Sequence, residues 1–401
     1  MSKWKYQGDN EANEKLPAYD KIRRSKDKRK KYKSAESEFA LAEADWNFVE
    51  HPSWFAARIV EVHKRYAFIS PEKTIGDVDT RDVWLATVAR RYLQSRREER
   101  NTITVGDRVL CRPTDKNDAD LGTDLPCCVI EHIAPRHSRI ARRDPALETR
   151  EHILASNVDQ LLIVSSYQSP SVKWGLIDRY LVLAEEQGIP ALIVLNKADL
   201  MRQESVDFKE ECEREMAIYR QLGYQVFSLE VEFQTWQTEA IQELHRQMEG
   251  KVTILSGHSG VGKSSLVNLF KPEIVQEVEP NSDIFYKGRH TTTYASMIKL
   301  GRGGYVIDTP GIRSFVLSER SAVELSHGFI ELRSHINQCK FRECRHMDEP
   351  DCSVLRAVAE GLISERRYRS YKGMLLGDSG RQGRTREDKS GRKFIEFDED
   401  E

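Results

Sequence analysis

Eight consecutive residues, Gly257 to Ser264, read GHSGVGKS and match the pattern G-x-x-x-x-G-K-[ST]. They follow the apolar run VTILS and precede the helical pattern SLVNLF, so they lie where a strand turns into a helix. Glycines in such a loop let main-chain N–H groups converge on phosphate oxygens, which the positive end of the helix also faces. The pattern predicts a phosphate-binding loop in which Lys263 contacts the β- and γ-phosphates and Ser264 binds Mg²⁺. A glycine turn that merely joins strand to helix is the alternative.

A second motif, Asn196-Lys197-Ala198-Asp199, directly follows the apolar run ALIVL. Doubly wound sheets place their ligand-binding loops at such strand ends. Guanine presents two donors on one edge, N1–H and the 2-amino group, and the Asp199 carboxylate can accept from both, whereas adenine has no such pair there. Asn196 would support the loop and the other edge of the base, and the stem of Lys197 would lie across the ring. A helix N-cap at Asp199 is the alternative. Beside a phosphate loop, the motif favours a guanine nucleotide.

Two further segments offer candidate Mg²⁺ ligands. Asp308 begins the sequence DTPG, directly after the strand pattern GYVI. We expect Asp308 to hold Mg²⁺ through a water molecule and the Gly311 N–H to bond the γ-phosphate, so that loss of this phosphate releases the loop. The sequence GRHTTT, residues 288–293, supplies hydroxyls for the same metal, with Thr291 and Thr292 as the candidates. A polar turn before YASMIKL is the alternative for this segment.

The order of the motifs differs from that of common GTPases, in which the phosphate loop comes first and the base-recognising motif last. Here NKAD precedes the phosphate loop and DTPG follows it, which indicates a circularly permuted sheet. Ile312 occupies the position where many GTPases carry the glutamine that orients the attacking water, and isoleucine cannot do this. His290 is therefore the candidate catalytic residue, with a histidine that only anchors its loop as the alternative.

A cluster near the C-terminus has the composition of a metal site. Cys339-x4-Cys344-x-His346-x5-Cys352 places three thiols and one imidazole within 14 residues. This is a complete tetrahedral set for a structural Zn²⁺, with no position left for a reacting water. The predicted role is to fold the local segment. Three ordinary buried cysteines with an unrelated histidine are the alternative. The other four of the seven cysteines show no ligand spacing, and the odd total does not indicate a disulfide framework.

Three regions of the chain must position these residues. Short β-branched or alternating segments from Phe55 to about Pro135 predict a small closed or partly closed β-barrel. From Val158, strand and helix patterns alternate, which predicts a parallel sheet with helices on its faces. After about Val323 the pattern is helical and holds the cysteine cluster.

Composition bounds the class of protein. At 401 residues the chain has room for two to four domains. No run approaches the ~20 apolar residues of a membrane helix, and the N-terminus lacks the apolar segment of a secretory signal. We therefore expect a cytoplasmic protein with no membrane partner.

The distribution of charge bears on nucleic-acid binding. The net charge is −2, but Lys21–Lys33 holds nine basic residues in thirteen with one acid. Arg136–Arg143 and Arg366–Arg369 are further Arg-rich stretches, offset by acidic helices and an acidic tail. The chain is predicted to be basic where RNA would lie.

Together, the permuted order, GRHTTT, DTPG followed by a hydrophobic residue, and C-x4-C-x-H-x5-C make residues 55–374 resemble the ribosome small subunit-dependent GTPase A family. The fold class that this implies is multidomain: an N-terminal OB-like β-barrel, a central α/β P-loop GTPase domain that is circularly permuted, and a C-terminal mainly helical zinc-binding domain. The expected boundaries are 1–50 for a disordered basic extension, 51–140 for the RNA-binding barrel, 150–320 for the GTPase domain, 321–376 for the zinc-binding domain and 377–401 for a disordered charged tail.

The resemblance implies a factor in late maturation of the small (30S) ribosomal subunit. Such a protein binds the subunit and its rRNA near the decoding centre and hydrolyses GTP to GDP and phosphate when the subunit stimulates it, which drives its own release. We expect a monomer. An alternative is a nucleotide-gated RNA-binding checkpoint factor that depends little on turnover. A P-loop kinase or transferase lacks a recognisable acceptor site and conflicts with the guanine motif.

Matching positions give the expected ligands. GTP is assigned to Asn196, Lys197, Ala198, Asp199, Gly257, His258, Ser259, Gly260, Val261, Gly262, Lys263, Ser264, Ser265, Asp308 and Gly311; Mg²⁺ to Ser264, Thr291, Thr292 and Asp308; and Zn²⁺ to Cys339, Cys344, His346 and Cys352.

The chain departs from the family pattern at three places. His258 stands where the family usually has glutamine, and the small-residue loop behind the guanine appears only as Ser228-Leu229-Glu230. The basic extension is longer than is common in the family, and it is either a solvated tail or an extra rRNA contact.

Overall fold

The computed structural model describes residues 53–63, 65–72, 83–89, 103–114, 125–144, 147–231, 238–270, 295–301, 303–308, 321–377, 384–387 and 393–396. The predicted basic extension lies outside the described residues. So do His290, Thr291, Thr292, Gly311 and Ile312.

Five short strands close into a barrel. They are β1 (Phe55–Val62), β2 (Ala67–Pro71), β3 (Trp84–Val88), β4 (Arg108–Pro113) and β5 (Cys127–Ile133), paired in the order β1-β2-β3-β5-β4, and β4 pairs back onto β1. Successive residues of a strand point to opposite faces, so Phe55, Ala57 and Ile59 of β1 are buried in a core that belongs to the barrel alone. The predicted barrel is confirmed.

An antiparallel hairpin follows the barrel along the chain. Its strands are β6 (Arg139–Asp144) and β7 (Leu147–Ser156). The sequence patterns predicted no strands here, because the Arg-rich run masks the alternation of Ile140 and Ile153, both of which are buried.

The α/β region is built on six strands: β8 (Gln160–Ser166), β9 (Ala191–Asn196), β10 (Gln225–Ser228), β11 (Val252–Ser256), β12 (Ser296–Lys299) and β13 (Tyr305–Asp308). Their order is β10-β9-β8-β11-β13-β12, and all are parallel except β12, which is antiparallel to β13. Strands β8, β9 and β11 are apolar along most of their length because both faces of the sheet are covered.

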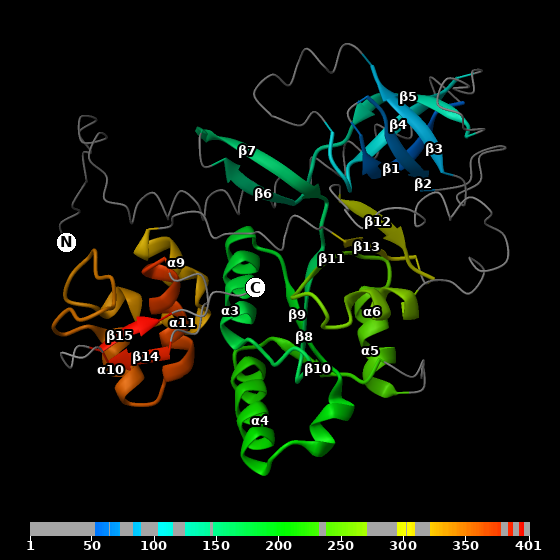
Figure 1. Cartoon of the computed structure of the whole chain (residues 1–401). Coiled ribbons are helices and arrows are strands. Elements are labelled where there is room, and N and C mark those ends of the chain that lie inside the picture. Colours follow the sequence, from blue (N-terminus) through cyan, green and yellow to red (C-terminus); the bar gives the residue numbers. More distant parts are fainter. Residues whose placement is uncertain are drawn as a thin grey trace, which may run out of the picture. The chain divides into compact units, whose positions relative to one another are not determined.

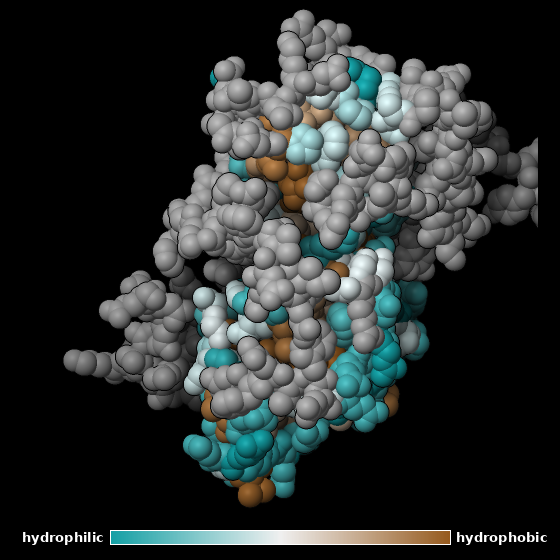
Figure 2. All heavy atoms as spheres, turned by 90° about the vertical axis from the view of Figure 1, so that its right-hand side faces the viewer, coloured by the Kyte–Doolittle hydropathy of each residue, from teal (hydrophilic) through white to brown (hydrophobic). Residues whose placement is uncertain are grey.

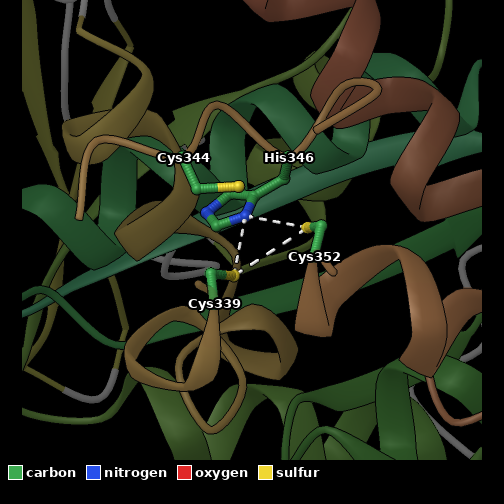
Figure 3. Close-up of side chains that lie close together, drawn as sticks. All are labelled: Cys339, Cys344, His346 and Cys352. Carbon is green, nitrogen blue, oxygen red and sulfur yellow. Dashed lines mark hydrogen bonds between the residues drawn. The ribbon is translucent and has the colours of Figure 1, made fainter. Parts of the chain in front are cut away.

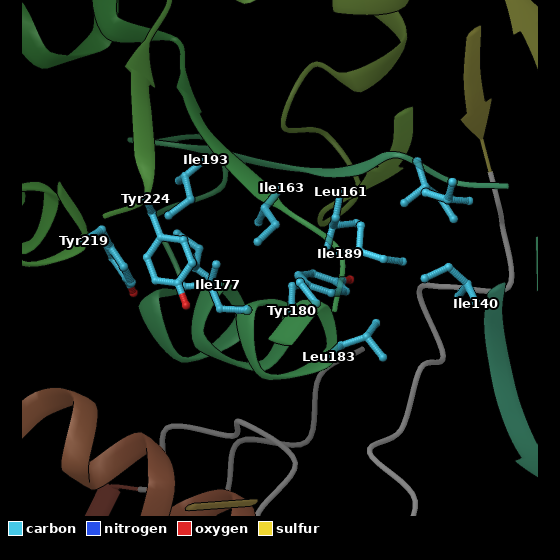
Figure 4. Packing of buried hydrophobic residues seen from close by; sticks show 14 of the residues in the cluster. Ile140, Leu161, Ile163, Ile177, Tyr180, Leu183, Ile189, Ile193, Tyr219 and Tyr224 are labelled. Carbon is cyan, nitrogen blue, oxygen red and sulfur yellow. The ribbon is translucent and has the colours of Figure 1, made fainter. Parts of the chain in front are cut away.

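Helices cover the two faces of this sheet. Figure 1 shows α3 (Trp174–Gln187) and α4 (Val206–Gln221) on one side and α5 (Glu239–Met248) and α6 (Lys263–Phe270) on the other. Each face has its own hydrophobic core. In Figure 4, Ile163 and Ile193 from the strands pack against Ile177 and Tyr180 of α3. Helix α3 is capped by Gly188, whose left-handed φ of 69° allows the chain to turn away.

The C-terminal region is mainly helical, as predicted. Its elements are α9 (Ala322–Gly328), the 3₁₀ turns η4 (Ile330–Leu332) and η5 (Ile336–Gln338), α10 (Ser353–Ala359) and α11 (Glu365–Leu375). Helix α9 begins with a capping box formed by Ser321 and Glu324. Within the predicted charged tail, β14 (Arg384–Glu387) and β15 (Lys393–Glu396) pair as an antiparallel hairpin.

On the face shown in Figure 2, hydrophobic side chains show only in patches. Large hydrophobic side chains that are well exposed among the described residues are Val206, Phe341, Leu362 and Leu376. None of the described helices has both the length and the apolar character needed to cross a membrane.

Candidate functional site

The two predicted nucleotide-binding loops meet at one edge of the parallel sheet. The phosphate loop follows β11 and the NKAD motif begins at the end of β9, with β8 between these strands. Asn196 joins the loops, because its Nδ2 donates to the Val261 carbonyl at 3.0 Å across 65 residues of sequence. Its Oδ1 accepts from the Val231 N–H at 3.3 Å. Asn196 is therefore placed to set the distance between the phosphate and base regions.

Close approach explains two glycines of the phosphate loop. Gly257 and Gly262 have φ values of 146° and 95°. A Cβ on Gly257 would lie 2.0 Å from the Val164 carbonyl oxygen, and one on Gly262 would lie 2.2 Å from Asn196 Nδ2. Any side chain at 262 would therefore push Asn196 away and separate the two loops.

The interior of the phosphate loop is prepared for an anion. Lys263 is largely buried, and its ammonium donates to the carbonyls of Gly257 and His258 at 2.8 and 2.6 Å. The next two residues, Ser264 and Ser265, are exposed in the first turn of α6. A helix N-terminus and a lysine at the same place favour phosphate groups. The assignment of these residues to GTP remains a prediction.

The base-recognising side contains an unsatisfied acceptor. Oδ1 of Asp199 is buried and has no hydrogen-bond partner among the described residues. A buried carboxylate oxygen without a donor costs free energy, which the N1–H and 2-amino groups of guanine would recover. Lys197 has a left-handed φ of 61°, and its ammonium donates to the Ser169 carbonyl. These features fit the predicted guanine contacts.

The segment that departs from the family pattern lies beside the NKAD motif. Leu229 donates its N–H to the Leu195 carbonyl at 2.9 Å, and its own carbonyl accepts the Ala198 N–H at 3.0 Å. Main-chain bonds therefore hold this segment, so its position does not depend on small side chains.

Tyr167 is a supporting residue that the motifs do not identify. Its N–H donates to the Asn196 carbonyl at 3.1 Å, and its hydroxyl donates to Ser228 Oγ at 2.9 Å. It is buried, and this burial raises the pKa of its phenol. The available signal was position alone, since Tyr167 follows β8 at the same sheet edge as the two motifs.

The predicted Mg²⁺ and catalytic residues are placed only in part. The main chain of Asp308 ends β13, where it pairs with Leu255 of β11, two residues before Gly257. The sheet therefore brings Asp308 next to the phosphate loop. Because the segments with His290, Thr291, Thr292 and Gly311 lie outside the described residues, their roles stay predictions.

The predicted zinc ligands converge. In Figure 3, Cys339, Cys344, His346 and Cys352 surround one point, and their ligand atoms all lie within 4.8 Å of one another. His346 Nδ1 lies 3.5 Å from the sulfurs of Cys339 and Cys352, which are 3.8 Å apart. Ordinary zinc bond lengths in a tetrahedron give S···N of about 3.6 Å and S···S of about 3.8 Å. The donor set and these separations fit Zn²⁺.

Hydrogen bonds hold the turn that carries His346, whose φ is 59°. The Glu349 carboxylate accepts from three main-chain N–H groups, those of Arg345, Met347 and Asp348, at 2.7, 2.8 and 3.3 Å. Burial alone would raise the pKa of Glu349, but these donors lower that pKa to about 2. From α11, the Tyr368 hydroxyl donates to the His346 carbonyl at 2.7 Å. The turn is thus held by α11 as well as by its own capping carboxylate.

Burial also sets the protonation of the metal ligands. It raises the pKa of the Cys344 and Cys352 thiols and lowers the pKa of His346. The lowered pKa favours the neutral imidazole that a metal ligand requires. The raised thiol pKa values mean that metal binding there must release protons.

The structure contradicts part of the predicted RNA-binding surface. Arg367 is 1% exposed and ion-paired with Asp178 and Glu331, and Arg366 pairs with Asp178 at 2.6 Å. In the other Arg-rich stretch, Arg136 donates to the buried Asp107 at 2.6 and 2.8 Å. These arginines are used inside the protein, because acids that are distant in sequence are close in the fold. The side chain of Arg369, by contrast, is exposed to solvent.

The chain is similar to known GTPases in both sequence and structure. The family model described as RsgA GTPase matches residues 133–318. The small ribosomal subunit biogenesis GTPase RsgA of Shewanella oneidensis is 40% identical over 278 residues, covering 68% of this chain and 74% of that protein. The crystal structure of YjeQ from Thermotoga maritima superposes with a TM-score of 0.60 at 29% identity, over 82% of this chain and 100% of that one. YloQ, titled a circularly permuted GTPase, gives 0.59 at 25% identity, over 84% and 99%.

Proposed function

Since this chain belongs to the RsgA GTPase family, we propose that it acts in late maturation of the small ribosomal subunit. The chain is a GTP hydrolase of ribosome biogenesis with a circularly permuted GTPase domain. The proposal adds that it binds the 30S subunit through rRNA, is stimulated by that subunit and leaves it after hydrolysis. It further assigns the protein to the cytoplasm as a monomer.

The observation that carries the proposal is the hydrogen bond by which Asn196 connects the two nucleotide-binding loops. The base-recognising motif precedes the phosphate loop in this sequence, the reverse of the usual GTPase order. The hydrogen bond from Asn196 Nδ2 to the Val261 carbonyl joins the two. Asp199 then offers a buried, unpaired acceptor on the base side. A guanine nucleotide spanning the two loops would satisfy both the acceptor and the phosphate loop.

In the proposed reaction, water attacks the γ-phosphorus of GTP, and GDP and phosphate leave. Lys263 would balance charge on the phosphates, and Ser264 and Asp308 would hold Mg²⁺, which supplies further neutralisation of charge when bound. His290 would position the water in place of the missing glutamine. Each of these roles follows from the motif positions and is part of the proposal.

The zinc-binding region has a structural part in the proposal. Cys339, Cys344, His346 and Cys352 would hold one Zn²⁺, which would order the segment that contains them. For RNA, the basic side chains must be others than Arg366 and Arg367, which are ion-paired within the protein. Arg342 and Arg345 beside the cluster are exposed and suit phosphate contacts.

The proposal is tested by GTP turnover with purified 30S subunits, with 50S subunits as the control. We expect turnover to rise at least tenfold with 30S subunits only. His290→Ala should abolish the stimulated turnover while leaving GTP binding intact. Equal turnover with the two subunits would contradict the ribosomal assignment.

The checkpoint alternative makes a different prediction about release from the subunit. If hydrolysis drives release, a non-hydrolysable GTP analogue should retain the protein on 30S subunits while GTP allows it to leave. Equal release rates with the two nucleotides would favour the nucleotide-gated checkpoint function.

A further inference from the structure

One buried carboxylate connects the C-terminal helices to the GTPase core. Asp178 lies in the first half of α3 and is fully buried. Its Oδ2 accepts from Arg366 Nη1 at 2.6 Å, and its Oδ1 accepts from Arg367 Nη1, also at 2.6 Å. The Tyr219 hydroxyl of α4 donates to the same Oδ1 at 2.6 Å. Both oxygens of Asp178 therefore hold α11, across 188 and 189 residues of sequence.

Further side chains fix the orientation of the two arginines that bind Asp178. Arg366 also donates to Glu215 of α4 at 2.5 Å, and Arg367 donates to Glu331 of η4 through Nε and Nη2. Both guanidinium groups lie near the Tyr219 ring, with their central carbons 5.5 and 5.4 Å from its centroid. Each guanidinium is thus fixed by two carboxylates and an aromatic ring. Arginines that bind two carboxylates from different elements allow little rotation between those elements.

Helix α3 starts from a loop that touches both nucleotide-binding motifs. The carbonyl of Ser169 accepts the ammonium of Lys197 from the base side. Pro170 and Lys173 line a small pocket together with Gly257, His258 and Val261 of the phosphate loop. Residues 166–173 therefore lie between the phosphate loop and the NKAD motif and lead directly into Trp174 at the start of α3.

The far end of the connection is the metal cluster. On α11, four residues after Arg367, the Tyr371 hydroxyl donates to the Arg345 carbonyl at 2.6 Å, and Tyr368 bonds His346. The same helix that Asp178 holds therefore also holds the turn that carries a predicted zinc ligand. This route links the nucleotide site to the metal cluster without the segments that hold Thr291 and Gly311.

We propose that α3 couples guanine-nucleotide occupancy to the zinc-binding region, with Asp178 as the positioning residue that keeps the connection rigid. The inference rests on the proposed nucleotide site. Base binding would draw Lys197 away from Ser169, and phosphate binding would draw Lys263 away from Gly257 and His258. The first change acts directly on Ser169, and the second acts through Gly257 and His258, which line the same pocket as Pro170 and Lys173. Helix α3 and its salt-bridged α11 would follow these changes. A ligand shifts a conformation only through such differential contacts.

The test is amide hydrogen exchange in α10 and α11 of the full-length protein, with and without GDP. In the wild type, GDP is expected to slow exchange in these helices by about fivefold or more, the lower end of ordinary coupling between sites. Asp178→Asn should bind GDP but lose this response. Glu185→Gln is the matched control, because it removes another ion pair between α3 and the C-terminal region, that with Arg333 at 2.7 Å, and should keep the response.

A second variant covers the case in which Asp178→Asn does not fold. Tyr219→Phe removes one hydrogen bond to Asp178 and leaves both ion pairs, and it is expected to reduce the GDP response by about half. GDP binding is measured on the same samples with a fluorescent GDP analogue. Binding without any slowing in α10 and α11 of the wild type overturns the coupling and leaves the proposed function intact. An undiminished response in Asp178→Asn also overturns the coupling. If Asp178→Asn does not fold, an undiminished response in Tyr219→Phe does so. Failure of the wild type to bind GDP contradicts the proposed function itself.

Discussion

Asp199→Asn is the sharpest test of the base-recognising loop. The substitution keeps the size of the side chain and replaces one acceptor oxygen by an amide donor. In the structure, Oδ1 of Asp199 is buried and has no partner among the described residues, so a guanine would supply its only donors there. The amide nitrogen of asparagine would face one of the two guanine donors, so that hydrogen bond is lost, and the bond to the remaining oxygen no longer has a charged acceptor.

The size of the effect follows from those two bonds. A hydrogen bond to a charged group contributes about 1.5–3 kcal/mol and one between neutral groups about 0.5–1.5 kcal/mol, so losing the first bond and neutralising the acceptor of the second costs about 2.5–4.5 kcal/mol. At about 1.4 kcal/mol per tenfold change, GDP affinity should fall by roughly 10²–10³-fold. Xanthine carries a carbonyl where guanine has its 2-amino group, so the variant should bind xanthosine diphosphate more tightly than GDP.

The assay is competition of GDP and xanthosine diphosphate against a fluorescent nucleotide, with the fold checked by circular dichroism. Asp207→Asn is the matched control, since Asp207 is an exposed acid in the first turn of α4 and should leave both affinities unchanged. A folded Asp199→Asn protein that binds GDP within about threefold of the wild type would refute the assignment of Asp199 to the base.

Three further predictions concern the phosphate loop, the metal cluster and the buried ion pairs. Gly262→Ala should weaken GDP binding about tenfold or more in a fluorescence titration, because its Cβ would displace Asn196. Gly250→Ala, with a φ of 69° but no neighbour within 4 Å, should not. Cys344→Ser should lower bound zinc from about one ion per chain to near zero by atomic emission, with loss of protease resistance in residues 321–377, whereas wild-type zinc content in the variant would contradict the site. Burial alone would raise the pKa of Asp178, but Arg367 and Arg366 lower it below 3.8. Its ionised form therefore stabilises the fold above that pH, and this stabilisation is lost as the pH falls toward the folded pKa. Urea unfolding should show Asp178→Asn about 3–5 kcal/mol less stable at pH 7, with the two proteins converging below pH 4. A difference that is the same at pH 7 and pH 3 would refute this electrostatic origin.

Much of the nucleotide site is predictable from the sequence because its chemistry is local. A phosphate loop binds its ligand with consecutive main-chain N–H groups. The segment GHSGVGKS therefore predicts both the loop and its need for glycines. The apolar runs before residues 196, 257 and 308 predicted three parallel strands, and β9, β11 and β13 are those strands. The zinc cluster is local in the same sense, since all four donors lie within 14 residues.

The supporting residues are not predictable in this way. Tyr167 and Asp178 belong to no motif, and each acts through partners from another element. Gly262 shows the two contributions at a single position. Its presence follows from the loop pattern, but the close approach of Asn196 that requires it comes from strands β9 and β11, which the sheet brings to one edge.

The sequence by itself determined the permuted order of the motifs, the strands that precede them and the set of metal donors. Only the tertiary structure decided which arginines are ion-paired within the protein and which are exposed to solvent. Arg366 and Arg367 look in sequence like a basic surface for RNA, and they are instead held by Asp178, Glu215 and Glu331. An arginine is solvated or paired according to what surrounds its guanidinium group. For these two residues the surroundings come from helices up to 189 residues away, which no local pattern contains.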